Sequence, residues 1–446
     1  MKRIKNVALG VSGLLLLATQ VNAVQTGEVT ASSPAAPVAP VISTTVAKNS
    51  GSKASQISVS HSSSVSYSYS SNQDADDPMR AKTFSKSFGV DRGDKVNLSN
   101  QYGGMTIKTW DKNEVKVDVD IKAYANTEDA AQRLLDNTNI NASKSGDVVS
   151  FKTSIGDGNK GSGSRNGKRW RQEVKVYYTV YMPSTNALTA SQEYGGIVMD
   201  NFAGPTSLKV QYGNLTAGDL SNANNYISVQ YGKCVLQDLN QARIKHQYGG
   251  GLTIASVGTL DLDAQYTSVN INTIKNSATI KHQYGSGLTI GTAGTLNLDL
   301  QYTSVNIGTV RNASVIRHQY GSGITIGNAG PLDLDVQYAT VKIANLHGNL
   351  GARIQYGSLS ANNIDATSRN INVNAEYSSV ALGFDAGYSA DFDVAVSYNS
   401  FKYGSNVTAR KTSDDDDQTK RYTGQIGRGG SNKVTVRSAY NSVTFR

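Results

Sequence analysis

A tyrosine recurs every 18 residues through the middle of the chain. Seven tyrosines between positions 248 and 356 keep this spacing without exception, and a glutamine precedes each of them. Strict self-similarity at a short period is the signature of a solenoid, because each unit can bury its apolar face only against its neighbours. The seven pairs are Gln247 and Tyr248, Gln265 and Tyr266, Gln283 and Tyr284, Gln301 and Tyr302, Gln319 and Tyr320, Gln337 and Tyr338, and Gln355 and Tyr356.

Further tyrosines extend this series with looser spacing. In all, 14 of the 24 tyrosines occupy the repeated position, which explains why tyrosine so outnumbers the 8 phenylalanines and 2 tryptophans. Two of the additional members, Tyr102 and Tyr440, lie apart from the others in the sequence. The remaining additional members are Tyr194, Tyr212, Tyr231, Tyr377 and Tyr398.

Within one repeat, apolar and polar residues alternate. Leu296, Leu298 and Leu300 alternate ahead of Tyr302, and the alternation resumes on the opposite parity at Val305. A period of two indicates half-buried strands, and the change of parity at the tyrosine indicates a corner or a bulge. The sequence therefore predicts an all-β fold, a single-stranded β-helix (β-solenoid) whose 18-residue coils each contain two short strands.

A 36-residue coil is the alternative, because Gln-Tyr-Gly and Gln-Tyr-Thr repeats alternate. The position three residues before each tyrosine decides between the two. If 18-residue coils stack directly, residues of opposite charge become neighbours in this column, which is favourable. Coils of 36 residues would instead place residues of the same charge next to one another, which is unfavourable. The column reads Lys245, Asp263, Lys281, Asp299, Arg317, Asp335 and Arg353.

The tyrosine column has two readings. Alternation gives the tyrosines the parity of the leucines and isoleucines, so we expect them to pack inward or at an apolar corner. Stacked tyrosines and glutamines would then form structural ladders that hold the coils in register. The alternative is an exposed aromatic strip that binds sugar rings.

The first residues have the features of an export signal. Residues 1–23 combine three basic residues, an apolar stretch and a small-residue cleavage site, as in a secretory signal peptide. Residues 24–81 are rich in Ser, Ala and Pro and predict a disordered linker. We expect export to the periplasm, outer surface or extracellular space, most naturally in a Gram-negative envelope, with no membrane-spanning helix after signal cleavage. The single cysteine, Cys234, excludes a disulfide scaffold.

Three regions follow the linker. Residues 82–183 predict a β-rich lead-in with a short helix at 127–137, which Thr127 would cap and which would shield the open end of the stack. Residues 184–410 form the solenoid, and residues 411–446 an acidic loop followed by C-terminal strands. The lead-in contains a Gly- and Ser-rich loop that is a candidate for binding an anionic ligand. Its residues are Lys160, Arg165, Lys168, Arg169, Trp170 and Arg171.

Motifs for catalysis are absent from the sequence. No GxSxG, HExxH or phosphate-binding loop occurs. His246, His282 and His318 lie two coils apart, too far to share a metal, and we interpret them as core residues. The acidic run 414–417 lacks the spaced ligands of a calcium loop. We therefore predict no cofactor, no metal and no enzymatic activity; a polysaccharide-cleaving β-helix with carboxylates such as Asp261 and Asp333 is the alternative.

Several segments resemble a known family. The stretch from Asn100 to Trp110, the short helix, the Tyr177–Pro183 segment and the repeated Gln-Tyr-Gly turns are similar to the bacterial "putative adhesin" domain of unknown function. The resemblance implies an exported β-solenoid of the cell envelope, in which no catalytic residues carry over. We expect a role in surface attachment or envelope organisation, with glycans or envelope and surface proteins as partners and no nucleic acid. An envelope signalling accessory that binds a partner protein is a further alternative.

Overall fold

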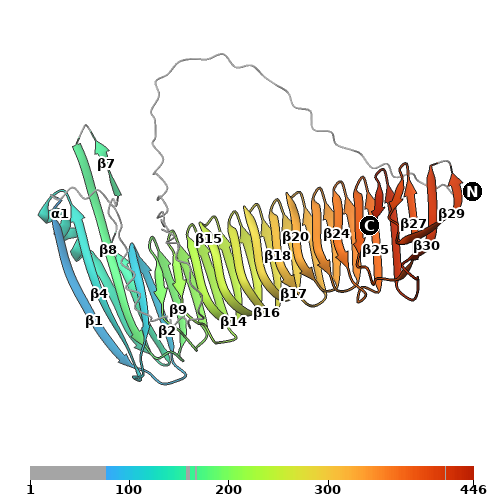
Figure 1. The fold of residues 1–446 in the computed structure, drawn as a ribbon. Helices are drawn as coiled ribbons and strands as arrows, with labels where there is room; N and C mark the ends of the chain where they lie inside the picture. Colours follow the sequence, from blue (N-terminus) through green and yellow to red (C-terminus); the bar gives the residue numbers. More distant parts are fainter. Residues whose placement is uncertain (1–76, 157–160, 166–167, 417) are drawn as a thin grey trace, which may run out of the picture. The chain divides into compact units, whose positions relative to one another are not determined.

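The repeats form a β-solenoid with coils of about 18 residues, as predicted. The computed structural model describes residues 77–446 except 157–160, 166–167 and 417. Through the middle of this region the strands lie side by side in sequence order (Figure 1). The predicted signal peptide and residues 24–76 of the predicted linker lie outside the described residues.

Each coil contributes one strand that runs into a ladder tyrosine. Together these parallel strands form the first of two sheets. In spatial order it contains β2 (Lys95–Gln101), β9 (Ala187–Glu193), β11 (Thr206–Gln211), β13 (Asn225–Gln230), the second halves of β14 (Lys233–Gln247), β15 (Gly251–Gln265), β16 (Ser268–Gln283) and β17 (Gly287–Gln301), then β19 (Ser314–Gln319), β21 (Leu332–Gln337), β23 (Leu350–Gln355), β25 (Asn370–Glu376), β31 (Lys433–Ala439) and β27 (Ala390–Ser397).

The strands that follow the tyrosines form the second sheet, also with parallel pairing. In spatial order it contains β3 (Gly103–Thr109), β10 (Ile197–Met199), β12 (Leu215–Ala217), the first halves of β14 to β17, β18 (Ser304–Val310), β20 (Gly323–Ala329), β22 (Thr340–Leu346), β24 (Ser358–Ile364), β26 (Ser379–Phe384), β32 (Val443–Phe445) and β28 (Phe401–Tyr403).

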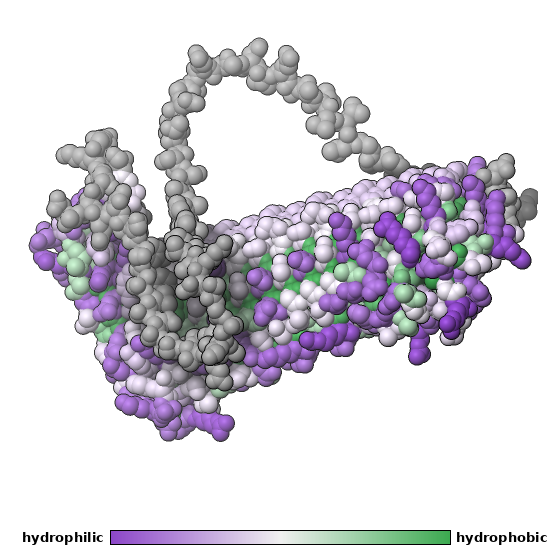
Figure 2. All heavy atoms as spheres, in the orientation of Figure 1, coloured by the Kyte–Doolittle hydropathy of each residue, from purple (hydrophilic) through white to green (hydrophobic). Residues whose placement is uncertain are grey.

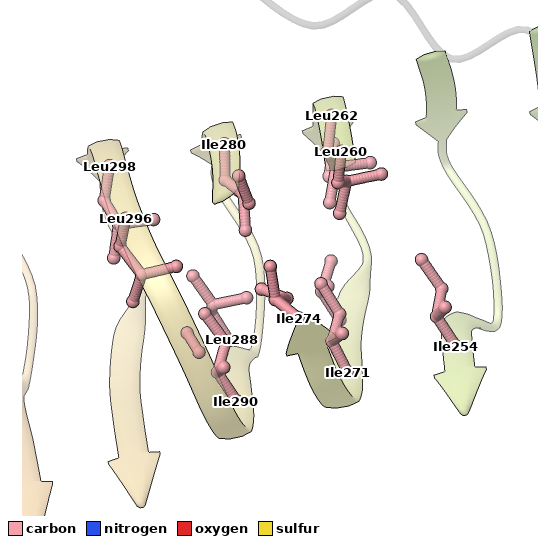
Figure 3. Packing of buried hydrophobic residues seen from close by; sticks show 14 of the residues in the cluster. Ile254, Leu260, Leu262, Ile271, Ile274, Ile280, Leu288, Ile290, Leu296 and Leu298 are labelled. Atoms are coloured by element: carbon pink, nitrogen blue, oxygen red, sulfur yellow. The ribbon is translucent and has the colours of Figure 1, made fainter. Parts of the chain in front are cut away.

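The core lies between the two sheets. Leu262, Ile280 and Leu298 of the first sheet point toward Ile271 and Ile290 of the second, and each is at most 1% exposed (Figure 3). Because burial of one such side chain contributes roughly 1.5–3 kcal/mol, the alternation on every strand supplies the main driving force for stacking. Residues of similar hydropathy consequently form bands along the stacked coils (Figure 2).

Strand pairing confirms the 18-residue coil. Lys245 is paired with Asp263, Asp263 with Lys281, and the opposite-charge pairing continues to Arg353. The corners after Tyr248, Tyr284 and Tyr320 contain one extra residue, and in β15 to β17 the shifts in register after Val257 and Ile274 compensate for it. Neighbouring repeats therefore differ in their corners while their tyrosines stay in step.

The N-terminal region extends both sheets. The antiparallel strands β1 (Met79–Gly89), β4 (Glu114–Ala125) and β8 (Lys168–Met182) continue the second sheet from β3. The hairpin of β5 (Thr138–Ser145) and β6 (Val148–Ile155) continues the first sheet from β2. Helix α1 (Glu128–Asp136) begins at Thr127, whose hydroxyl accepts a hydrogen bond from the Ala130 amide. It packs across β4, β1 and β8, so it covers a sheet face and leaves β1 as the edge strand.

The solenoid is longer than the predicted range 184–410. Its first coil, β2 and β3, lies in the predicted lead-in. Its C-terminal strands β31 and β32 insert between the coil of β25 and β26 and the coil of β27 and β28. The final hairpin of β29 (Val407–Asp416) and β30 (Thr419–Ile426) pairs antiparallel with β27 and ends the first sheet.

Cys234 lies in the core, where its side chain is 0% exposed. Burial in apolar surroundings raises the pKa of its thiol, because the thiolate would lose its hydration. We expect no reaction with Ellman's reagent in the native protein and one thiol per chain after denaturation. Rapid labelling of the native protein would contradict the burial of this strand.

Candidate functional site: the tyrosine edge

All fourteen ladder tyrosines adopt a left-handed backbone conformation. Their φ angles lie between +49° and +66°, and in the described part of the chain no other non-glycine residue has a positive φ. A left-handed residue reverses the direction of the next side chain, which explains the change of parity that the sequence shows at each corner. The fourteen include Tyr102 and Tyr440, the two members that lie apart in sequence.

The tyrosine side chains point outward. From Tyr194 to the C-terminal end of the ladder they are 41–54% exposed, so the expectation that the column packs inward is wrong. The period-two rule that led to that expectation holds only for an unbroken extended backbone. Because the tyrosine itself is left-handed, both it and the preceding glutamine face solvent.

The rings form one continuous stack. Neighbouring ring centroids lie 4.4–5.4 Å apart, and the ring planes are inclined by no more than 14°. Tyr102 stacks on Tyr194 at one end, and Tyr440 lies between Tyr377 and Tyr398 at the other. A left-handed non-glycine residue costs roughly 1–2 kcal/mol. Each ring pair contributes roughly 0.5–1.5 kcal/mol, so stacking offsets much of the strain.

This conformation makes an unusual prediction for truncation of a ring. Tyr284→Gly and Tyr284→Ala both remove the two stacking contacts of Tyr284, but only alanine retains a Cβ at φ +53°. We expect the glycine variant to be more stable than the alanine variant by about 1 kcal/mol, the reverse of the usual order in strands. Denaturant unfolding of the two variants checks this. Greater stability of the alanine variant would contradict the left-handed assignment.

Glutamines form a second ladder beside the rings. The Gln283 side-chain amide donates to the Gln301 side-chain oxygen at 3.1 Å, and Gln230 donates to Gln247 at 3.0 Å. Their backbones also contribute. Each tyrosine amide from 248 to 338 donates to the glutamine carbonyl of the next coil at 2.9–3.1 Å. The hydrogen-bond ladder between coils therefore continues through the corner. We call the exposed tyrosines and the adjoining glutamines the tyrosine edge.

Three histidines lie inside the corners. His246, His282 and His318 are 0% exposed, and the Nε2 of each lies 3.0 Å from a backbone carbonyl oxygen of the preceding coil. Because a carbonyl only accepts, Nε2 carries the proton. Burial lowers the pKa of all three imidazoles, which are therefore neutral. The Thr303 hydroxyl lies 3.2 Å from Nδ1 of His282, whereas Nδ1 of His246 and of His318 has no hydrogen-bond partner.

Histidine accompanies the corners that carry the extra residue. A Cβ at Gly285 would lie only 2.0 Å from Nε2 of His282, and Gly249 and Gly321 have the same relation to their histidines. The sequence carries this signal, since Gly follows the tyrosine in every repeat that has His two residues before it.

The candidate anionic-ligand loop contains a hairpin. Strand β7 (Gly161–Arg165) pairs antiparallel with the start of β8. The Arg171 guanidinium lies 2.6 Å from Glu173 and 3.3 Å from Asp77, and stacks over Tyr124 at 4.4 Å. The ring of Trp170 lies against Gly161 and Gly163. These two residues therefore have structural partners. Lys160, and the side chains of Arg165, Lys168 and Arg169, lie outside the described residues.

The other candidate groups do not converge. Asp414–Asp416 lie in β29 rather than in a loop, and Asp417 and the side chains of this run fall outside the description. Asp261 forms an ion pair with Arg243 at 2.8 Å, inside a shallow groove of about 790 Å³ on the outer face of the first sheet. Among the residues that the structure describes, no three His, Cys, Asp or Glu side chains gather closely enough to hold a metal ion. None of the described helices is long and apolar enough to cross a membrane.

Comparisons with known proteins give matches in structure alone. No family model and no curated protein matches the chain. A solved structure from Clostridium sporogenes, described as a "putative cell adhesion protein", is 9% identical over 82% of this chain and 99% of its own, with a TM-score of 0.15. A "putative adhesin" from Bacteroides fragilis is 12% identical over 82% and 97%, with a TM-score of 0.16. A "putative adhesin" from Parabacteroides merdae is 10% identical over 68% and 92%, with a TM-score of 0.21. TM-scores of this size transfer no function to the chain.

Proposed function

We propose that this chain is an exported, non-catalytic binding protein of the adhesin type, acting in surface attachment or in organisation of the cell envelope. The observation that carries the proposal is the tyrosine edge, which presents the same two side chains to solvent on coil after coil. Tyrosine provides a large amphipathic contact surface and loses little conformational entropy when it binds. Here stacking and the corner backbone already fix the rings, so binding would immobilise few additional side chains.

Repetition favours extended partners. A partner that contacts one coil weakly can contact the next coils in the same way, so many weak contacts sum to a stable attachment. The carboxylates that suggested a polysaccharide-cleaving enzyme do not favour that alternative. Asp261 is paired with Arg243, and the aspartates of the neighbouring column alternate with lysines and arginines.

Co-sedimentation with cell-envelope fractions of the source organism tests this function. We expect saturable binding of the exported chain, reduced in a variant with Tyr266→Gly and Tyr302→Gly, which removes two rings and leaves a residue suited to the left-handed corner. The matched control carries Asn270→Ala and Asn306→Ala, two exposed residues in one column of the second sheet. It should bind like the natural sequence. Absence of saturable binding, or equal binding by the tyrosine variant, would contradict the proposal.

A further inference from the structure

We propose that the tyrosine edge binds a neutral, extended, β-1,4-linked glycan that lies along the stack, so that successive sugar residues meet successive coils. This inference rests on the proposed binding function and adds the chemical class of the ligand. Four observations carry it: the spacing of the rings, the parts of the rings left accessible, the charges around the edge and its uninterrupted length.

The spacing of the tyrosine rings suits a polymer whose units advance along its axis by about the separation of stacked β-strands. Ring centroids lie 4.4–5.4 Å apart, around the ~4.8 Å separation of adjacent strands. One sugar residue of an extended β-1,4-linked chain advances along its axis by nearly the same distance. The sugar residues of such a chain therefore stay in register with the successive tyrosines (the rungs of the edge). An α-1,4-linked chain of the same sugar is helical and curves away from the edge.

The accessible parts of the rings favour hydrogen bonding. Because neighbouring planes are nearly parallel, the face of each ring within the stack is covered by the next ring. The 48% exposure of Tyr266, Tyr284 and Tyr302 thus belongs mainly to the ring rims with their hydroxyl groups. A phenol hydroxyl both donates and accepts, and a glutamine amide that donates one N–H to the next coil keeps its second N–H for a ligand. This is a repeated polar surface suited to the hydroxyls of a sugar chain.

From Tyr248 to Tyr338 the surroundings of the edge are neutral, whereas Glu193 and Glu376 take the place of the glutamine beside Tyr194 and Tyr377. Glutamines flank the rings on one side, and small residues such as Ser268, Ser286 and Ser304 follow them on the other. The nearest charged column alternates in sign from coil to coil, so its field largely cancels a short distance from the surface. A uniformly anionic or cationic polymer would gain nothing overall from such a column, whereas a neutral glycan meets no opposing charge.

The length of the edge supplies affinity. The stack is continuous from Tyr102 to Tyr398, in spatial order, across fourteen rings. A hexasaccharide would contact about six rungs, and longer chains would contact more. Affinity should therefore rise with chain length until the ligand spans the edge.

Calorimetric titration of the exported chain with cellohexaose tests the assignment, with maltohexaose as a ligand of the same sugar and length but the other linkage. The variant replaces the seven tyrosines 248, 266, 284, 302, 320, 338 and 356 by phenylalanine, which removes their hydroxyls, keeps the rings stacked and leaves no six consecutive rings with fewer than two altered ones. We expect cellohexaose to bind and maltohexaose not to bind. The seven substitutions should weaken cellohexaose binding by about tenfold or more, since at least two hydrogen bonds are lost wherever the ligand lies and each loss lowers affinity roughly two- to tenfold. The control with Asn270→Ala and Asn306→Ala should bind unchanged.

Three results would overturn the assignment: no binding of cellohexaose, equal binding of both hexasaccharides, or full binding by the phenylalanine variant. Circular dichroism of that variant shows whether its fold is intact, so a loss of binding with an intact fold is attributed to the hydroxyls. If the glycan assignment fails while the natural chain still binds envelopes, the ligand class is wrong and the proposed function stands. If envelope binding is absent as well, both are rejected.

Discussion

Acidification below about pH 6.5 is expected to destabilise the solenoid steeply. The pKa values of His246, His282 and His318 are lowered, first by burial, while the carbonyl that each Nε2 contacts acts in the opposite direction. In the unfolded chain these side chains take up protons near the ordinary value of about 6.5. The folded state therefore binds fewer protons than the unfolded state below that pH, and acid favours unfolding.

The size of the effect follows from proton linkage. The contribution of the three neutral histidines to the free energy of unfolding is fully present above the pKa of the unfolded chain. It falls as the pH drops from there toward the lowered pKa of the folded state. Within that window each histidine removes about 1.4 kcal/mol per pH unit, so three together approach about 4 kcal/mol per unit. Thermal unfolding between pH 8 and pH 5 should show the loss.

A triple variant isolates the histidine contribution. His246→Leu, His282→Leu and His318→Leu place at these positions the residue that Leu300 already supplies in the same column. The variant should lose much less stability over this range. Carboxylates affect stability over a lower range of pH. The Lys144 ammonium holds the pKa of Asp94 below its usual range, and the stabilisation by the ionised Asp94 is lost only near pH 4 and below. Parallel curves for the natural chain and the variant would contradict the buried, neutral histidines.

Gly285→Ala is expected to be among the most destabilising single changes in the repeats. The new Cβ would lie 2.0 Å from Nε2 of His282 and 2.5 Å from the Thr267 carbonyl oxygen. That nitrogen and that oxygen are the two ends of the 3.0 Å hydrogen bond between neighbouring coils, so relief of the contact breaks the bond. Overpacking of this kind costs roughly 1–3 kcal/mol.

Gly250→Ala provides the matched control. It lies at the corner after Tyr248, is exposed, and its nearest neighbour would be 4.0 Å from the added methyl group. We expect a change within about 0.5 kcal/mol. Adding His282→Ala to Gly285→Ala should restore only part of the stability, because the carbonyl of Thr267 remains in contact. Since coils of a solenoid can open locally, hydrogen exchange around 267–290 should accompany the unfolding measurement. Equal stability of the two alanine variants would contradict the corner geometry.

The coil length and the register of the coils could be predicted from the sequence because every repeat contains the same signals for both. The spacing of the tyrosines gives the coil, and the alternation of Lys245, Asp263 and Lys281 selects 18 residues over 36. The short helix was predictable for a local reason, the Thr127 cap followed by acidic residues in the first turn. These features depend on nearest neighbours in sequence or in the stack.

The outward direction of the tyrosines was not predictable from alternation. A left-handed tyrosine is rare among non-glycine residues, and the period-two rule assumes its absence. Only the change of parity at Tyr302, read as a backbone reversal at the tyrosine itself, could have indicated it. The position of Tyr440 was hidden for a different reason. Its coil is inserted between two earlier coils, and no local pattern records the spatial order of strands.

Nitration of the tyrosines, mapped by mass spectrometry in the free protein and in the envelope-bound protein, tests the central claim most directly. Tyrosines 248, 266, 284, 302, 320, 338 and 356 should react in the free chain because their rims are exposed, whereas the buried Tyr178 and Tyr388 should not. Binding should protect the ladder tyrosines and leave Tyr403, which is exposed and outside the ladder, reactive. Unreactive ladder tyrosines in the free protein, or a bound protein whose ladder reacts as before, would contradict the account.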